Sequence, residues 1–424
     1  MNSEFEKNLN KYVDVILKVG LNLQQGQRLL IGVDNPVNSG TPVELAPFIQ
    51  LIVKKAYQMG AKFVEVLWSD PQLDLIRYQY APKDSFEEVS IWRKEAALEY
   101  ATKSDAILAI AAQDPEIFSD QDPALLMTQA QAKSILYRPF MQLLIKNNMN
   151  WLAVSAPVNG WAEKVFAEPS SDKIKAKLWD KIFQICRIDQ EDPILAWDNH
   201  IKNLQARCDY LNEKQYEALN IKSAGTDLTI GLARNHVWVG GNTKSQNGIT
   251  FVPNLPTEEI FTIPDKNKVH GTVRATKPLF INGALIEDFS FTFSNGKVIE
   301  YDASKGKEVL DNLLNYDEGA KYLGEIALVP HSSPISQTGL LFYNILIDEN
   351  ASIHIALGSG YKFSIENGEE MSDDDFIKAG GNNSMLHMDF MIGSKETNVD
   401  GIQEDGTVEP IMRNGEWVFN VSSK

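Results

Sequence analysis

Alternating helix and strand patterns fill the first half of the chain. Short apolar runs predict buried strands at 28–33, 62–68, 106–112 and 151–155. Longer amphipathic segments between them predict helices at 45–59, 90–102 and 124–146. This rhythm is typical of a mainly parallel sheet with helices on both faces. We therefore predict an α/β domain over residues 1–215, ending in two helices at 172–187 and 193–211.

The pattern changes near residue 216, where short β-rich segments separated by Gly, Asn and Pro begin. Strands are predicted at 227–232, 248–252, 268–274, 289–294 and 297–301. Asn295-Gly296 predicts a hairpin turn between the last two. A helix is predicted at 305–314, and the acidic run SDDDF at 372–376 is interpreted as a solvated turn. We predict a β-rich α+β domain over residues 216–424.

Composition excludes several classes of protein. A chain of 424 residues exceeds what one hydrophobic core usually supports, which favours two domains. The net charge of −17 disfavours nucleic-acid binding, because phosphate contacts require clustered Lys and Arg. No apolar run approaches the roughly 20 residues that cross a bilayer, and the first 20 residues are interpreted as a helix without a signal sequence. Two cysteines without a disulfide pattern are consistent with a cytoplasmic protein.

His387 and Asp389 provide the clearest candidate for chemistry. They are two residues apart in MLHMDF, so on a strand both side chains point to the same face. Met388 and Phe390 would then face the opposite way, into apolar packing. We predict a buried strand that carries two metal ligands. The alternative is a hydrogen-bonded core histidine.

Further carboxylates and an imidazole lie in two other segments of a chain that has only six histidines. These are Glu258 and Glu259 in PTEEIF, and Glu349 and His354 in DENASIH. Carboxylate oxygens and neutral imidazoles together are suitable ligands for a pair of divalent cations. The spacing alone does not bring the segments together, and Glu349 is equally compatible with an ordinary turn.

Three long segments carry a resemblance to a known family: NLPTEEIFT at 254–262, TGLLFYNILIDENASIHIALGSGY at 338–361, and HMDF at 387–390. Together they resemble the thermophilic aminopeptidase family, of the aminopeptidase T type, and the resemblance covers essentially the whole chain. It implies a metal-dependent aminopeptidase that acts on peptides with a free N-terminus. It also implies two divalent metal ions (Co, Zn or Mg) and a homodimer, and mixed carboxylate and histidine ligands are in addition suitable for Mn.

The resemblance also implies a site. The ligand set would be Glu259, Glu325, Glu349, His354, His387 and Asp389, with Glu325 as the expected bridge. Tyr361 would lie near the metals and stabilise the developing oxyanion or protonate the leaving group. Glu258 is open to three interpretations: a group behind the ligands, a general base, or an exposed side chain.

Charge balance is consistent with this set, because four carboxylates and two neutral imidazoles match two dications. Two other functions remain open: a two-domain α/β small-molecule binding protein, and a di-metal hydrolase of a non-peptide amide. Neither a G-x-G-x-x-G fingerprint after the first strand nor a phosphate-binding P-loop motif is present, so no nucleotide cofactor is predicted.

Overall fold

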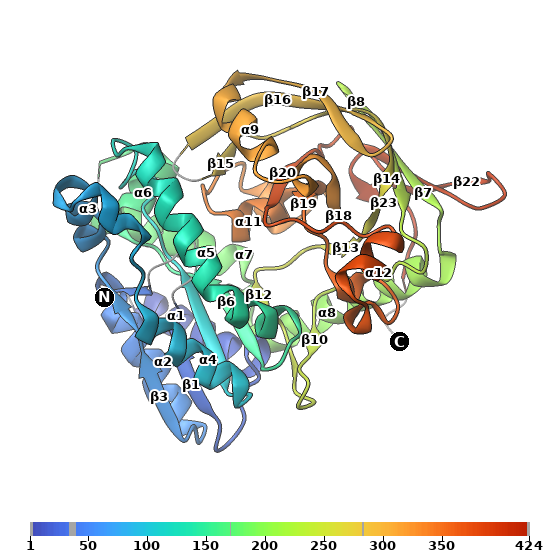
Figure 1. Ribbon diagram of the computed structural model, residues 1–424. Helices are drawn as coiled ribbons and strands as arrows, with labels where there is room; N and C mark the ends of the chain where they lie inside the picture. Colours follow the sequence, from blue (N-terminus) through green and yellow to red (C-terminus); the bar gives the residue numbers. More distant parts are fainter. Residues whose placement is uncertain (1–2, 34–39, 170, 282–283, 422–424) are drawn as a thin grey trace. The chain divides into compact units, whose positions relative to one another are not determined.

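The structure is a computed structural model that describes residues 3–33, 40–169, 171–281 and 284–421 (Figure 1). Residues 1 and 2, with which the predicted amino-terminal helix begins, lie outside the described residues. Contacts group the chain into two compact units. Unit 1 contains 1–198 and 242–256, and unit 2 contains 199–241 and 257–424. The domain assignment 1–215 and 216–424 stays a prediction.

Unit 1 is built on a five-stranded parallel sheet, as the sequence predicts. Its strand order is β12-β6-β5-β1-β3, and every neighbouring pair in it is parallel. The strands are β1 (Arg28–Ile31), β3 (Phe63–Val66), β5 (Ala106–Ala111), β6 (Trp151–Ser155) and β12 (Asn254–Leu255). Strand β12, which returns from the second half of the chain, was not predicted. Two small pairs complete the unit: β2 (Thr41–Pro42) with β4 (Trp68–Ser69), and β10 (Thr243–Lys244) with β11 (Thr250–Phe251).

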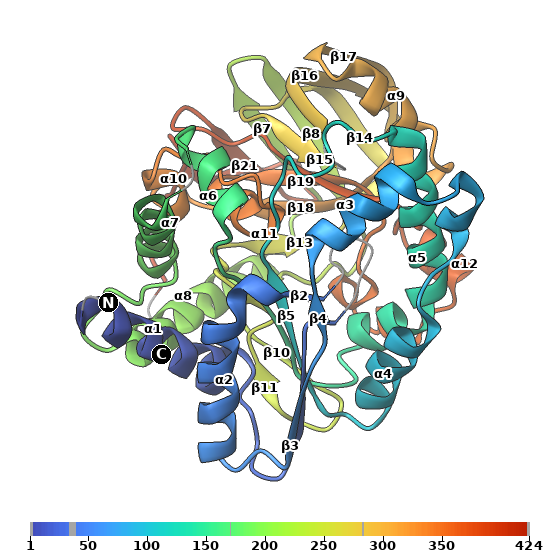
Figure 2. The same cartoon turned by 90° about the vertical axis from the view of Figure 1, so that its left-hand side faces the viewer.

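Helices cover both faces of this sheet (Figure 2). On one face lie α1 (Ser3–Val15), α2 (Ala46–Gln58) and α7 (Asp172–Ile185), joined by ring contacts such as Phe48–Trp179 at 5.2 Å. On the other face α4 (Ile91–Thr102) and α5 (Pro123–Ile145) share a core with Leu30 and Ile107. Unit 1 also contains α3 (Pro71–Tyr80) and α6 (Asn159–Phe166), and α8 (Pro193–Lys214) begins in unit 1 and continues into unit 2.

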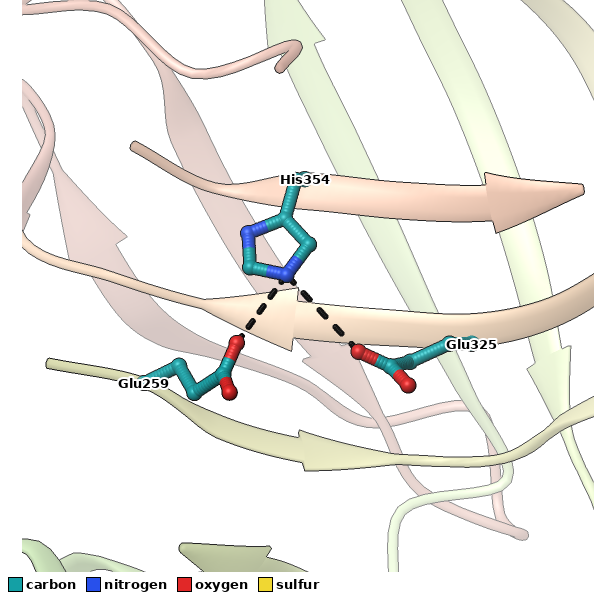
Figure 3. A group of neighbouring side chains, drawn as sticks. All are labelled: Glu259, Glu325 and His354. Carbon is teal, nitrogen blue, oxygen red and sulfur yellow. Dashed lines mark ion pairs between the residues drawn. The ribbon is translucent and has the colours of Figure 1, made fainter. Parts of the chain in front are cut away.

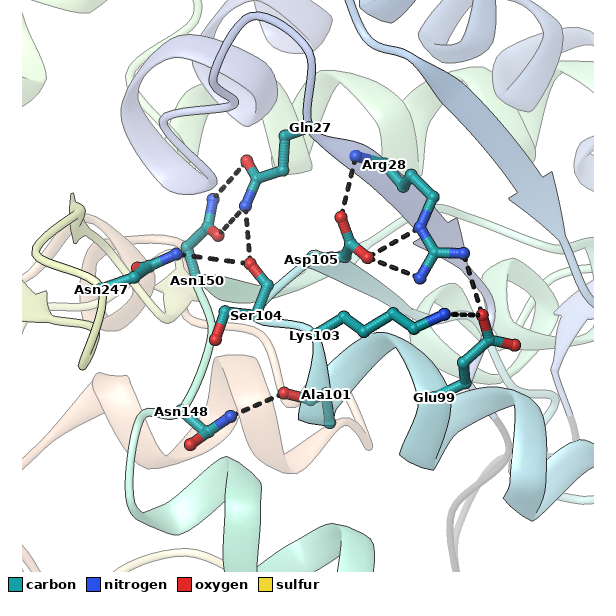
Figure 4. Close-up of polar contacts among 10 residues, drawn as sticks. All are labelled: Gln27, Arg28, Glu99, Ala101, Lys103, Ser104, Asp105, Asn148, Asn150 and Asn247. Carbon is teal, nitrogen blue, oxygen red and sulfur yellow. Dashed lines mark hydrogen bonds and ion pairs between the residues drawn. The ribbon is translucent and has the colours of Figure 1, made fainter.

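A polar network fixes the starts of the central strands of unit 1 (Figure 4). The Arg28 guanidinium donates to Asp105 at 2.7 Å and to Glu99 at 3.1 Å. Gln27 Nε2 donates to Asn150 Oδ1 at 2.6 Å, and Asn150 Nδ2 donates to the carbonyl of Leu21 at 2.7 Å. These bonds satisfy polar groups where β1, β5 and β6 begin, so the partly buried network supports the register of the sheet.

Unit 2 contains two antiparallel sheets. The nine-stranded sheet has the order β15-β16-β14-β8-β7-β21-β22-β23, with β17 paired to β16. Its strands are β7 (Ala218–Ser223), β8 (Thr226–Leu232), β14 (Pro264–Arg274), β15 (Leu279–Ile281), β16 (Ala284–Ser294), β17 (Lys297–Lys305), β21 (Asn398–Ile402), β22 (Val408–Arg413) and β23 (Glu416–Trp417). The predicted hairpin turn is confirmed: Asn295 and Gly296 have φ of 50° and 81° between β16 and β17.

The second sheet of unit 2 has five strands in the order β20-β19-β18-β13-β9, and all neighbours are antiparallel. The strands are β9 (Val239–Gly240), β13 (Ile260–Thr262), β18 (Leu323–Leu328), β19 (His354–Gly358) and β20 (His387–Met391). One core lies between the two sheets, where the ring of Phe390 on β20 contacts Phe289 at 5.5 Å and Phe291 at 5.2 Å. One face of the five-stranded sheet is therefore apolar and fully buried.

Four shorter helices complete unit 2: α9 (Lys307–Leu314), α10 (Pro334–Gln337), α11 (Ile345–Asp348) and α12 (Asp373–Lys378). Helix α12 corrects the interpretation of SDDDF as a turn. Ser372 caps the helix by accepting from the backbone of Asp375, acidic residues occupy its first turn, and Phe376 is buried. Among the described residues, no helix combines the length and the apolar character that crossing a membrane requires.

Candidate metal centre

The five-stranded sheet of unit 2 has two chemically different faces. Because side chains alternate along a strand, Ile326, Ile355 and Phe390 point into the apolar core while their neighbours face the other way. The strand pairing aligns Glu325 with Ala356 and Ala356 with Asp389. It also aligns Ala327 with His354 and Gly358 with His387. Carboxylates and imidazoles on this face are thus paired across the strands with the small residues Ala327, Ala356 and Gly358.

Glu259, Glu325 and His354 form the first group of potential ligands on this face (Figure 3). His354 Nε2 lies 3.0 Å from Glu259 Oε2 and 3.7 Å from Glu325 Oε1. All three residues are buried. Glu325 is 4% exposed and faces two histidines.

Glu325, His387 and Asp389 form a second group. His387 Nε2 lies 3.3 Å from Asp389 Oδ1 and 3.8 Å from Glu325 Oε2. The predicted strand is confirmed, since His387 and Asp389 lie on one face of β20 and Met388 and Phe390 lie in the core. Glu325 belongs to both groups, with one carboxylate oxygen towards each histidine. Within each group the candidate ligand atoms lie within 4.8 Å of one another.

Both histidines are held by backbone carbonyls in the same way. His354 Nδ1 lies 3.1 Å from the carbonyl oxygen of Ser352, and His387 Nδ1 lies 2.8 Å from that of Ser359. A carbonyl only accepts, so Nδ1 carries the hydrogen and Nε2 is directed towards the carboxylates. A metal-binding histidine commonly has this arrangement, because the bond at Nδ1 fixes both the ring and its tautomer.

Glu349 and Tyr361 lie in the electrostatic field of the same cluster. Burial, followed by the charges of Glu259 and Asp389, raises the pKa of Glu349 well above its usual range. Burial also raises the pKa of the Tyr361 phenol, and the nearby carboxylates raise it further, with the largest contribution from Glu325. The Tyr361 ring lies 5.2 Å from the ring of His387 and stacks on Phe363 at 5.1 Å. The phenol therefore keeps its proton at neutral pH.

The cluster carries more negative charge than its own side chains neutralise. Burial disfavours protonated His354, but hydrogen bonds to Glu259 and Glu325 outweigh it and raise the pKa. Burial also lowers the pKa of His387, but the charge of Asp389 and a hydrogen bond to it outweigh burial, so the pKa of His387 rises to about 10. Among the described residues, Asp389 Oδ1 is buried without a hydrogen bond of acceptable geometry. Excess carboxylate charge, inward Nε2 atoms and an orphaned oxygen fit divalent cations.

Glu258 lies apart from both groups. Its carboxylate is 4% exposed and lies 3.5 Å from His200 Nε2, which also contacts the carbonyl of Thr257 at 2.8 Å. Another histidine of unit 2, His331, contacts Ser336 Oγ through Nδ1 at 3.2 Å.

Sequence reasoning missed two buried asparagines next to the cluster. Asn350 accepts from the backbone of Glu258, and Asn382 donates to the carbonyl of Gly358. No local sequence pattern marks either residue, because each acts through contacts distant in sequence.

A comparison with known families decides the relationship of the chain. The family model described as Thermophilic metalloprotease (M29) matches residues 5–417. The chain belongs to the M29 family of thermophilic metalloproteases. The resemblance seen in the sequence is therefore confirmed.

Relatives of this M29 protein match it over nearly its whole length. Aminopeptidase AmpS of Bacillus subtilis is 43% identical over 98% of this chain and 99% of its own. Aminopeptidase 2 of Geobacillus stearothermophilus is 43% identical over 99% of this chain and 100% of its own length. The solved structure of wild-type AmpT from Thermus thermophilus superimposes with a TM-score of 0.91 at 39% identity, covering 98% and 100% of the two chains. The chain is a hydrolase of the metallo-aminopeptidase class, and its predicted fold class is confirmed.

Proton release provides a test of the electrostatics of the cluster. Without a cation, the raised pKa values of His354 and His387 keep both rings protonated at pH 7.5. Coordination requires neutral imidazoles and ionised carboxylates, so binding should release at least two protons per chain: those of His354 and His387, and any proton that the raised pKa of Glu349 retains. Calorimetric titration with Zn²⁺ in two buffers of different ionisation enthalpy measures this number, and identical heats in both buffers would contradict the account.

The same shift sets the pH dependence of the metal-free protein. His387 has a pKa of about 10 in the folded chain against 6.5 for an ordinary histidine. Stability from its ion pair is therefore complete below pH 6.5 and lost as the pH rises towards 10. Thermal unfolding of the metal-free protein should show a falling Tm over this range.

Proposed function

We propose that this protein releases single residues from the free N-terminus of peptides, using two divalent cations. The observation that supports this most directly is the shared position of Glu325 between His354 and His387. Glu259, Glu325, Glu349, His354, His387 and Asp389 would hold the ions, with Glu325 as the bridge. The ligand types suit Zn, Co or Mn, and the family resemblance adds Mg.

When bound, such a pair of ions supplies an activated water at neutral pH, polarises the scissile carbonyl and offers a binding position for the α-amine. The chain supplies the remaining functions. The buried sheet fixes Glu325, His354, His387 and Asp389, so little reorganisation of these side chains accompanies the reaction.

Tyr361 is proposed as a proton and hydrogen-bond donor. Its pKa is raised by burial and by the surrounding carboxylates, so the phenol enters the reaction protonated. It is thus available to stabilise an oxyanion or to protonate the leaving amine. Glu258 is kept as a candidate for proton transfer, because its carboxylate lies within 3.5 Å of the imidazole of His200.

Two further properties remain part of the proposal: assembly as a homodimer, and a cytoplasmic location. The two buried free cysteines, Cys186 and Cys208, are compatible with a reducing compartment.

The requirement for a free peptide N-terminus tests the exopeptidase assignment. A free tripeptide and its N-acetylated form are offered to the metal-loaded enzyme, before and after removal of metal with EDTA. We expect cleavage of the first bond of the free peptide only, since an acetylated nitrogen is a poor ligand, and loss of activity that Zn²⁺ or Co²⁺ restores. Equal cleavage of both peptides would overturn the assignment, and activity on other amides alone would favour a non-peptide hydrolase.

Removal of one hydroxyl group tests Tyr361. We expect Tyr361→Phe to lower kcat about 100-fold with little change in KM, because the phenol acts on charge that develops in the transition state. The matched control is Tyr301→Phe, whose hydroxyl donates to Asp311 on another part of unit 2. Steady-state kinetics on an aminoacyl chromogenic substrate measures both variants. An unchanged kcat in Tyr361→Phe would remove Tyr361 from the mechanism.

A further inference from the structure

The segment that carries Glu259 lacks the support of a sheet. Residues 257–259 precede β13, outside any strand, so their backbone groups need other partners. The backbone N–H of Glu258 donates to Asn350 Oδ1 at 2.7 Å, and both residues are buried. The residue immediately before Glu259 is therefore anchored by a side chain 92 positions away in the sequence.

Asn350 is itself held on every side. It is 0% exposed, its Nδ2 donates to the carbonyl of Leu346 at 3.2 Å, and its own carbonyl accepts from Ser333 Oγ at 2.7 Å. It also directly follows Glu349 in the chain. One rigid residue thus connects the turn that carries Glu349 with the segment that carries Glu259.

We propose that Asn350 is a positioning residue that fixes Glu259 and Glu349 relative to each other for cation binding. This inference rests on the proposed function, because both carboxylates belong to the proposed ligand set. Asn350 acts through the backbone on both sides of the site, by accepting from the N–H of Glu258 and donating to the carbonyl of Leu346.

Removal of the amide should loosen one side of the centre. In Asn350→Ala the N–H of Glu258 stays buried without its acceptor, so the segment shifts to find another partner. Loss of a group that orients ligands typically weakens metal binding by about 10–100-fold. We expect this loss for Zn²⁺, and recovery of much of the activity when Zn²⁺ is in large excess.

Asn150→Ala is the matched control. Asn150 is also 0% exposed, and its amide makes equivalent bonds to Leu21 and Gln27, but it lies in unit 1. Both variants should lose thermal stability, whereas only Asn350→Ala should lose affinity for Zn²⁺. Affinity is measured by titration of the metal-free full-length chains in competition with a chelator.

The outcomes separate the inference from the proposed function. If the wild-type protein binds Zn²⁺ and Asn350→Ala binds it with the same affinity, the positioning role of Asn350 is wrong and the proposed function stands. If the wild-type protein does not bind Zn²⁺, both the positioning role of Asn350 and the proposed function are wrong. If Asn350→Ala does not fold, Ser333→Ala removes one bond to Asn350 and should weaken Zn²⁺ binding about threefold; unchanged affinity there would equally contradict the inference.

Discussion

The mutual repulsion of carboxylates gathered on a buried sheet face is the constraint around which unit 2 is arranged. Glu259, Glu325 and Asp389 lie close together with only two imidazoles, and Glu349 lies in their field. In a medium of low polarity such a group is costly unless protons or cations compensate it. The carboxylates raise the pKa values of His354 and His387, which favours proton binding by both imidazoles in the metal-free cluster. Cations would replace those protons.

The fold withstands this repulsion because the opposite face of the same strands is firmly packed. Ile326, Ile355 and Phe390 alternate with the site residues and enter the core shared with the nine-stranded sheet. The four cluster residues on these strands, Glu325, His354, His387 and Asp389, are therefore held in place by apolar burial on the opposite face. Ala356, between Glu325 and Asp389, keeps the two carboxylates apart without filling the space above them.

Patterns local in sequence predicted much of this arrangement. The βαβ rhythm gave the parallel sheet, and the i, i+2 spacing placed His387 and Asp389 on one face of a strand. Contacts distant in sequence were beyond such reasoning: the register that aligns Glu325 with Ala356, and the return of β12 to the sheet of unit 1. The error at 372–376 arose because charge was weighed above the capping Ser372 and the buried Phe376. Membership of the full ligand set came from the family resemblance.

The most direct test of the central claim is a crystal structure of the metal-loaded protein with anomalous diffraction recorded at the metal absorption edge. The account predicts two peaks about 3.5–4 Å apart. Each should lie within coordination distance of a different oxygen of Glu325, one next to His354 Nε2 and the other next to His387 Nε2. A single peak, or two peaks that leave Glu325 uncoordinated, would contradict it.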